Sequence, residues 1–174
     1  MRRPLLLLLA LMWLSSCFTY FDGPDAPEDR VYEETWHWIV TPEEAATYLS
    51  EQTVVVLDAR DANLATDPPA PGALMAPWQT CSRQDAPYRG LLLEDVNVLT
   101  ERLGELGVTQ ERGVLVLGDP LLGWGEDGRI VWMLRALGHE RVALVDGGAK
   151  ALLDEDPKAL ENAVFAPGTF EARG

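Results

Sequence analysis

Cysteine and histidine are scarce in this chain of 174 residues, which contains two of each. The histidines, His37 and His139, are far apart, and neither has a cysteine partner or acidic residues at the spacing of a metal site. Zinc and other transition metals need several such ligands at short spacings. The sequence therefore predicts no metal site and no cofactor, and we expect both histidines to be surface or structural residues.

Basic side chains are also few. The chain has 14 Lys and Arg against 28 Asp and Glu, which gives a formal net charge of −14. Such a polyanion binds poorly to nucleic acid, whose phosphates attract Lys and Arg. The same balance argues against a basic patch that would bind an acidic membrane surface. We therefore expect no nucleic-acid partner.

Long apolar runs are absent except near the N-terminus. Met1–Arg3 carry positive charge and lead into a run of about ten apolar residues, Leu5–Leu14. This run is too short for a typical membrane-spanning helix and has the length of the apolar part of a secretory signal. We interpret residues 1–16 as a signal peptide.

The end of this run resembles the lipobox of bacterial lipoproteins, in which small residues precede a cysteine. The residues are Leu14-Ser15-Ser16-Cys17. The resemblance implies cleavage before Cys17 and a lipid on that cysteine. Phe18 in place of an aspartate favours the outer membrane, facing the periplasm or the cell surface. Membrane attachment is then expected from Cys17 alone, and the alternative is an incidental cysteine beside an ordinary cleavage site.

The rest of the chain divides into a tether and one domain. Residues 17–35 are polar and acidic, and glycine and prolines interrupt any helical period there. Residues 36–174 are long enough for a single domain with a hydrophobic core. If Cys17 carries a lipid, Cys81 has no partner for a disulfide. We therefore expect packing alone to stabilise this domain.

Strands and helices alternate along the domain. A capping threonine, a proline and a glutamate in Thr41-Pro42-Glu43-Glu44 predict a helix to about Leu49. Apolar spacing predicts further helices, and short apolar runs predict strands. These helices are 94–107, 129–137 and one after 148, the strands are 53–57, 73–75, 114–117 and 142–145, and 80–90 is expected to be an exposed loop. The order predicts the α/β class, with a parallel sheet covered by helices on both faces.

The loop between the strand 114–117 and the helix from Arg129 has the position at which open parallel sheets bind ligands. Residues 118–128 hold three acidic side chains and no Cys, Ser, Thr, His or Lys. Nucleophilic catalysis therefore has only carboxylates available to it there. We expect Glu126 and Asp127 near the start of the following helix, where they suit its dipole and favour capping over anion binding.

Several segments, in their order and spacing, resemble a rhodanese domain, specifically the N-terminal, non-catalytic half of two-domain thiosulfate and mercaptopyruvate sulfurtransferases. The segments are Val54–Arg60, Pro71–Ala73, Leu103–Val108, Arg129–His139 and Val142–Gly148. Residues 167–173 are similar to the linker that leads into the catalytic half of those enzymes. The resemblance implies a rhodanese-like parallel sheet.

The same resemblance bears on the chemistry of the loop. In active members a cysteine takes up a sulfane sulfur, and close backbone amides stabilise its thiolate and persulfide. That position falls here at Gly118, and the oxygen of the neighbouring Asp119 cannot form a stable persulfide. The loop is also longer, and its apolar Leu121, Leu122 and Trp124 are expected to plug the cradle. No catalytic residue is predicted.

Other side chains are candidates for a cleft beside this loop. The candidate cleft residues are Asp58, Arg60, Gly118, Asp119, Trp124 and Arg129. Asp58 and Arg60 are expected to form an ion pair that supports the loop, with ligand contact as the alternative. We expect Trp132 in the core, whereas Trp124 suits a core or a ligand-stacking position equally.

Cys81 is the remaining thiol, and Arg83 lies two residues from it. A nearby cation could lower its pKa and make it reactive, but an unpaired loop cysteine without function is the favoured interpretation. The favoured function is a catalytically inactive binding or scaffolding module of an envelope lipoprotein, with an unknown envelope protein as its partner.

Two alternatives stay open. The first is an enzyme of the thiosulfate or 3-mercaptopyruvate sulfurtransferase type. It would act as a sulfur carrier through Cys81, or as one half of an enzyme completed by a separate catalytic domain. The second is a gene fragment that folds without a selected role.

Overall fold

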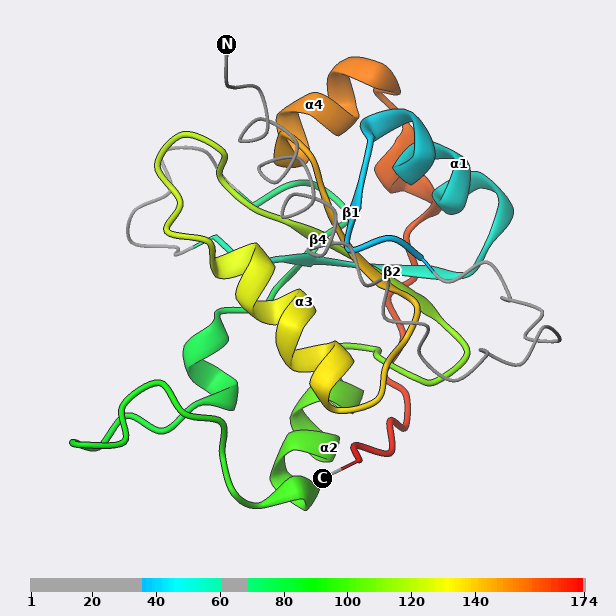
Figure 1. Cartoon of the computed structure of the whole chain (residues 1–174). Coiled ribbons are helices and arrows are strands. Elements are labelled where there is room, and N and C mark those ends of the chain that lie inside the picture. The colour runs from blue at the N-terminus through cyan, green and yellow to red at the C-terminus, as the bar shows by residue number, and fades with distance from the viewer. Residues whose placement is uncertain (1–35, 61–68, 174) are drawn as a thin grey trace, which may run out of the picture. The chain divides into compact units, whose positions relative to one another are not determined.

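Five parallel strands form the centre of the computed structural model, which describes residues 36–60 and 69–173 (Figure 1). The strands are β1 (Ile39–Val40), β2 (Val54–Asp58), β3 (Leu74–Met75), β4 (Gly113–Leu117) and β5 (Val142–Val145). Their order across the sheet is β1-β5-β4-β2-β3, and every pairing is parallel. The predicted α/β class with a parallel sheet is confirmed. The predicted signal peptide, Cys17 and the tether lie outside the described residues.

Within the described residues, four α-helices and two short 3-10 helices accompany the sheet. They are α1 (Pro42–Glu51), α2 (Val96–Glu105), α3 (Glu126–Ala136), α4 (Gly148–Glu155), η1 (Trp78–Cys81) and η2 (Ala159–Asn162). Helices α1 and α4 pack on one face of the sheet, and α2 and α3 pack on the other. Both faces are therefore covered, as the sequence predicts.

The central strands are buried because their side chains alternate between the hydrophobic layers on the two faces of the sheet. In β2, Val55 and Leu57 point to the layer of α2 and α3, whereas Val54 and Val56 point to the layer of α1 and α4. All five residues of β2 and all five of β4 are buried. A strand covered on both faces needs apolar residues at every position, which explains the continuous runs in the sequence.

Capping residues fix where the helices begin. Thr41 and Glu44 form the predicted capping box of α1. Asp95 caps α2 by accepting a hydrogen bond from the Asn97 amide, so this helix starts at Val96 and not at residue 94. Helix α3 also differs from the prediction, because it starts at Glu126, three residues before Arg129. Its first turn carries the two acidic residues that suit the helix dipole.

Two expectations about burial are wrong or incomplete. Trp132 is 53% exposed on α3 and not in the core, because its neighbours Ile130, Val131, Met133 and Leu134 form the buried face of that helix. Residues 80–90 are not wholly an exposed loop, since Cys81 and Ser82 are buried at the end of η1. Strand β1 is not among the strands expected from the sequence, because its two residues are too few to show a period.

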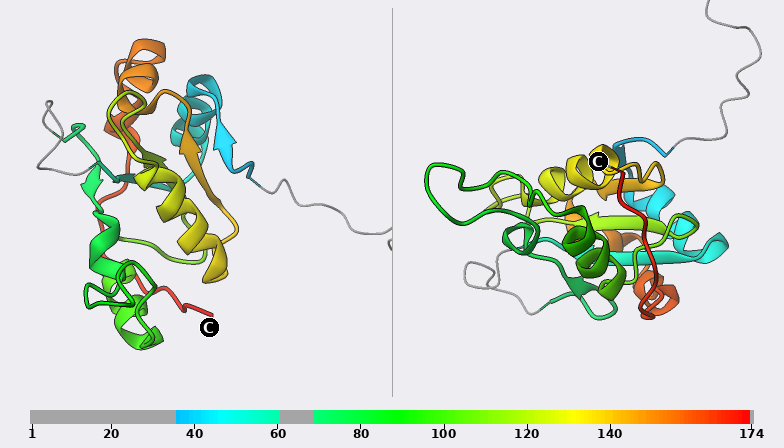
Figure 2. Two further views of the ribbon diagram at one scale, coloured as in Figure 1. Left: turned by 60° about the vertical axis from the view of Figure 1, so that its left-hand side comes forward. Right: turned by 90° about the horizontal axis from the view of Figure 1, so that it is seen from below.

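The C-terminal segment packs on the domain and does not extend away from it. The views in Figure 2 show it running beside α2, where the Gly168 amide donates to the Gly104 carbonyl over 2.8 Å. A Cβ on Gly104 would lie only 2.4 Å from the Gly168 oxygen, so the close approach requires glycine. Phe170 is fully buried in the same core as α2 and α3. Residues 163–173 thus belong to the folded domain.

Candidate functional site

A cavity of about 350 Å³ opens at the carboxyl edge of the sheet, beside the loop that follows β4. Its lining residues are Arg60, Pro69, Ala70, Pro71, Gly118, Asp119, Pro120, Leu121, Leu122, Gly147, Ala149, Lys150 and Leu153. They come from the segment after β2, the loop after β4 and the start of α4. Parallel sheets bind ligands in this position, so we take the cavity as the candidate site and call it the edge cleft.

One wall of the edge cleft rests on a buried ion pair. The Arg60 guanidinium donates to Asp58 through Nη2 and Nε, over 2.7 and 2.9 Å. Asp58 is fully buried and also accepts from the backbone amides of Arg60 and Ala70. The carboxylate therefore ties the end of β2 to the segment that follows it. The expected ion pair is therefore present, and the contacts of Asp58 support the segment after β2.

Gly118 lies where no side chain fits. A Cβ built on it would be 2.2 Å from Asp127 Oδ2 and 2.5 Å from Asp127 Cγ. A Cβ on Gly148 would in turn lie 2.2 Å from the Gly118 carbonyl oxygen. The backbone at the end of β4 is thus enclosed by the first turns of α3 and α4. Any larger residue at position 118 requires Asp127 to move.

Carboxylates satisfy the backbone amides of the loop. Asp119 Oδ1 accepts from the amides of Leu121 and Leu122, each over 2.9 Å. Glu126 Oε2 accepts from the Trp124 amide over 2.7 Å. The hydrogen bonds from Leu122 and Leu121 hold the pKa of Asp119 below its ordinary value. These amides therefore face fixed negative charge and cannot serve an incoming anion.

The expectation that the apolar loop residues plug the site is wrong. Leu121 is 89% exposed, Trp124 is 86% exposed and Leu122 is 56% exposed. The turn held by Asp119 directs these side chains outward, and the edge cleft stays open. Trp124 does not line the cleft, although Leu121 and Leu122 contribute to its rim. Trp124 is therefore not in the core, and it does not line the edge cleft.

Arg129 is also placed away from the edge cleft. Its guanidinium lies 4.1 Å from the centre of the Trp78 ring, and its Nη2 donates to the Gly90 carbonyl. It therefore connects α3 to the segment between β3 and α2. Arg129 lies in the first half of α3, the helix expected after the loop. Its side chain, however, contacts Trp78 and Gly90 and does not line the edge cleft.

The cleft has residues that the sequence analysis does not include. Ala149, Lys150 and Leu153 line it from α4, and Pro69–Pro71 line it from the segment after β2. The sequence feature that could have indicated these lining residues is Gly147-Gly148. Both glycines are in the left-handed region, with φ of +73° and +64°. Such glycines mark a tight turn at the carboxyl end of β5, so residues after them lie at the same edge of the sheet.

Cys81 lies apart from the cleft and is buried. Burial raises the pKa of its thiol because it disfavours the thiolate. Arg83, the predicted activating cation, instead binds Asp85 and Glu94 over 2.7 and 2.8 Å. The proposed lowering of the pKa of Cys81 by Arg83 is therefore wrong.

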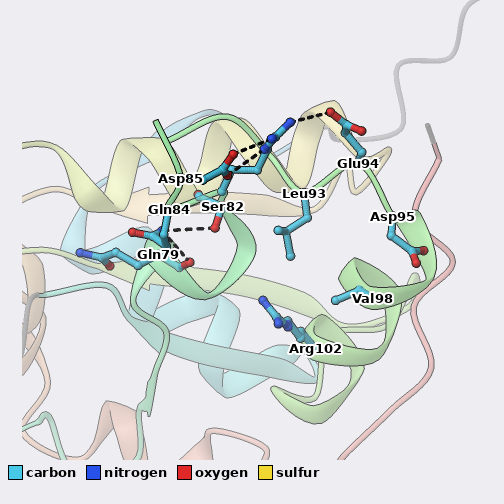
Figure 3. A pocket seen from close by; sticks show the side chains of 10 residues that line it. Gln79, Ser82, Gln84, Asp85, Leu93, Glu94, Asp95, Val98 and Arg102 are labelled. Carbon is cyan, nitrogen blue, oxygen red and sulfur yellow. Dashed lines mark hydrogen bonds and ion pairs between the residues drawn. The ribbon is translucent and has the colours of Figure 1, made fainter. Parts of the chain in front are cut away.

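A second hollow, of about 680 Å³, lies between η1 and α2 (Figure 3). Arg102 points into it, and Asp85 and Glu94 lie at its rim within the ion pairs of Arg83. Asp95 is engaged in capping α2. The acidic groups of this hollow thus have partners within the protein, which makes it a weaker candidate than the edge cleft.

Residues 36–60 and 69–173 contain no group of three or more His, Cys, Asp or Glu side chains arranged to hold a metal ion. No helix within these ranges has the length and apolar character needed to cross a membrane.

The described residues thus form a parallel α/β domain with a cleft at the carboxyl edge of its sheet. No protein-family model matches the chain. Among curated proteins, 3-mercaptopyruvate sulfurtransferase of Mus musculus is 31% identical over 104 residues, which cover 59% of this chain and 35% of that protein. Thiosulfate sulfurtransferase of Pseudomonas aeruginosa is 29% identical over 129 residues, which cover 74% of this chain and 46% of that protein. The chain spans about a third to a half of the length of the curated relatives it matches.

Solved structures give the same result for the fold. The 3-mercaptopyruvate sulfurtransferase SseA of Escherichia coli, described as having the rhodanese fold, aligns with a TM-score of 0.59 and 23% identity over 80% of this chain and 55% of that chain. The 3-mercaptopyruvate sulfurtransferase of Leishmania major aligns with a TM-score of 0.51 and 21% identity over 67% of this chain and 34% of that chain. This chain therefore carries a rhodanese-like domain that resembles thiosulfate and 3-mercaptopyruvate sulfurtransferases.

Proposed function

We propose that this rhodanese-like domain is a binding module that does not transfer sulfur. The observation that carries the proposal is the hydrogen bonding of the loop after β4. Asp119 and Glu126 occupy the amides of Leu121, Leu122 and Trp124. Amides bound to carboxylates cannot stabilise a thiolate or a persulfide, and a second anion there would meet like charge.

The residue at the end of β4 supports the same proposal. Gly118 has no side chain to accept sulfur, and Asp127 fills the space beside it. Cys81, the one cysteine within residues 36–60 and 69–173, is buried outside the edge cleft, and burial raises the pKa of its thiol. A buried thiol with little thiolate is a poor nucleophile. Neither position thus offers the reactive sulfur that transfer requires.

The edge cleft is the binding site that this proposal assigns. Its volume of about 350 Å³ is within the range of small-ligand sites, roughly 300–1,000 Å³. Its walls are mostly apolar, with Arg60 and Lys150 as the basic groups among the lining residues. Such a cleft suits a small, mainly apolar group of a ligand or of a partner protein.

The activity test uses the chain without its predicted leader. Residues 18–174 are incubated with thiosulfate and cyanide, and thiocyanate is measured against a heat-treated control. We expect equal rates in the two samples. Production of thiocyanate well above the control would contradict the proposal.

A second candidate function is one half of a divided sulfurtransferase. The observation that favours it is that the chain spans about a third to a half of its sulfurtransferase relatives. In this case a separately encoded catalytic domain binds the chain and supplies the cysteine. Co-purification of such a domain with the chain, with thiocyanate formed only by the pair, distinguishes this function from the first.

A third test concerns Cys81 as a sulfur carrier. Mass spectrometry after treatment with thiosulfate or mercaptopyruvate reports an adduct of about 32 Da, the mass of one sulfur atom. We expect no adduct on native residues 18–174 because Cys81 is buried. An adduct that the Cys81→Ser variant lacks would establish the carrier function.

The proposed setting of the module is the bacterial envelope, with a lipid on Cys17 and an unidentified envelope protein as its partner. The support is the lipobox resemblance of Leu14-Ser15-Ser16-Cys17 after an apolar run. The wild-type chain should sediment with membranes, and the Cys17→Ser variant should not be acylated. Mass spectrometry of the N-terminal peptide checks this. An intact N-terminus without lipid would contradict the setting.

A further inference from the structure

The loop after β4 presents three exposed large apolar side chains, two of which, Leu121 and Trp124, are the most exposed of this kind among the described residues. Leu121, Leu122 and Trp124 form a group that we call the loop tip. Hydrogen bonds to Asp119 and Glu126 hold the backbone at all three positions. The tip is therefore ordered before it meets any partner, and little conformational entropy is lost when it binds.

Clustered apolar residues on a surface indicate a contact site. Leu and Trp are also the residues that proteins place at the boundary between lipid and water, since the tryptophan ring is apolar with one polar edge. Single exposed apolar residues need no explanation, but three within four positions on one rigid loop do. The composition of the loop tip suits a lipid surface.

The chain outside the described residues indicates why a lipid surface would be near. The apolar run Leu5–Leu14 and Cys17 precede the domain, which begins at Trp36. The 19 residues from Cys17 to Trp36 reach at most about 65 Å. A domain of about 140 residues is roughly 35–40 Å across. The domain would therefore remain close to the membrane, and the tether is long enough to allow any face to turn toward it.

The parallel topology determines at which edge of the sheet Trp36 and the loop tip each lie. Trp36 precedes β1, so it lies at the amino edge of the sheet, and the loop tip follows β4 at the carboxyl edge. The first described residue and the loop tip thus lie at opposite edges of the sheet, so an anchor at Cys17 and the tip can reach one membrane only with a tether longer than the width of the domain. The maximum length of the tether, about 65 Å, exceeds the width of the domain, so this is geometrically allowed.

We propose that the loop tip inserts Leu121, Leu122 and Trp124 into the interface of a zwitterionic phospholipid membrane and turns the edge cleft toward the bilayer. The proposal takes the nearby membrane from the proposed envelope setting. It adds a second contact to the anchor at Cys17. A weak contact is sufficient because the tether keeps the effective concentration of the tip at the membrane high.

The charge around the loop tip determines which type of lipid it should prefer. Asp119 and Glu126 flank the loop tip, and the chain has a net charge of −14. Lys150, the lysine that lines the edge cleft, is paired with Asp154, and Arg60, the arginine that lines it, is paired with Asp58. An acidic membrane surface would repel this region, and a zwitterionic surface would not. The tip should therefore prefer phosphatidylcholine or phosphatidylethanolamine to anionic lipids, unlike a polybasic membrane protein.

The test couples residues 17–174 through the Cys17 thiol to a maleimide phospholipid in phosphatidylcholine vesicles. Cys81 is buried and does not compete for the maleimide. Tryptophan emission is compared between vesicles with ordinary and with brominated acyl chains, because bromine quenches only tryptophans at the lipid. We expect quenching in the wild type, its loss in Trp124→Ser, and its retention in Trp132→Ser, a control on the exposed side of α3.

A leucine pair tests the tip without removing a tryptophan. Leu121→Ser/Leu122→Ser should lose the quenching, whereas Leu91→Ser, which removes a leucine as exposed as Leu122, should keep it. Without coupling to lipid, residues 18–174 that carry Leu121→Ser/Leu122→Ser should partition onto vesicles about thirtyfold more weakly than the wild type. This is the loss expected for two leucines half buried in lipid.

Three results would overturn the proposal: no quenching in the wild type, equal quenching in the leucine pair and the wild type, or stronger quenching when a third of the lipid is anionic. None of these measurements depends on acylation, sulfur transfer or ligand binding in the edge cleft. Failure of the membrane contact is therefore distinguishable from failure of the proposed function.

Discussion

Gly118 shows how one residue can remove both a reactive group and the room for one. The carboxylate of Asp127 lies where a side chain at position 118 would start. Restoring a cysteine there also leaves the amides of the loop bound to Asp119 and Glu126. The loss of sulfur chemistry that we propose thus extends over the whole loop and is not limited to a single position.

A cysteine introduced at position 118 tests this statement. We expect Gly118→Cys to lower the free energy of unfolding by about 1–3 kcal/mol because of the contact with Asp127. The added Asp127→Ala change should recover part of that loss. Neither variant should form thiocyanate from thiosulfate and cyanide. Thermal unfolding and the thiocyanate assay provide the measurements, and activity in either variant would contradict the explanation.

His139 makes a second prediction at the residue scale. It is buried, its Nε2 lies 2.9 Å from the Thr109 carbonyl oxygen, and burial holds its pKa below the ordinary value of 6.5. As pH falls below about 6.5, the unfolded chain binds a proton at this histidine before the folded chain does. The free energy of unfolding should therefore fall with pH in that range.

Chemical denaturation between pH 7.5 and 5 measures this dependence. The His139→Gln variant should show a flatter pH dependence than the wild type over this range, whatever its overall stability. His37→Gln is the matched control, because His37 is exposed, and it should keep the wild-type slope. A slope unchanged by His139→Gln would assign the pH dependence to other groups.

At the scale of elements, the loop after β4 depends on its own carboxylates. Asp119→Ala removes the acceptor of the Leu121 and Leu122 amides. We expect hydrogen exchange of these two amides to accelerate roughly tenfold, because each amide loses its hydrogen bond to the carboxylate. The midpoint of global unfolding should stay close to that of the wild type, because the loop is exposed.

Asp156→Ala is the control for this loop, because Asp156 caps a different turn by accepting from the Lys158 amide. It should leave exchange of the Leu121 and Leu122 amides unchanged. Equal acceleration in both variants would indicate a general loss of stability, and no acceleration in Asp119→Ala would mean that its carboxylate does not order the loop.

Most elements could be predicted because their signals are local. The capping box of α1 and the apolar runs of β2 and β4 depend on neighbouring residues, and the structure confirms them. Strand β1 could not be predicted, because its two residues are positioned by parallel pairing with β5, in which Ile39 lies opposite Leu144 and Val40 opposite Val145. That interaction joins residues about a hundred positions apart, which no sequence period reports.

At the scale of the whole molecule, the C-terminal segment completes the core. Phe170 packs in the layer of α2 and α3, with its ring centre 5.7 Å from that of His139. Phe170→Ala should lower the free energy of unfolding by about 3–5 kcal/mol, the usual cost of removing a buried phenylalanine. Phe165→Ala is the matched control, since Phe165 is half exposed.

Urea denaturation compares the two phenylalanine variants. Phe165→Ala should change stability by about 0.5 kcal/mol or less. Similar losses in both variants, or a small loss for Phe170→Ala, would show that the segment does not contribute to the core as described.

The sequence by itself determined the α/β class, the parallel sheet and the place of the candidate site, because periodicity and caps are local and parallel strands end at one edge. It also determined that the loop after β4 has no Cys, Ser, Thr, His or Lys. Only the tertiary structure decided where the side chains point. Leu121 and Trp124 face outward, Arg129 turns to the other layer, and Cys81 is buried. Side-chain direction depends on hydrogen bonds and contacts between distant segments, which the order of residues does not display.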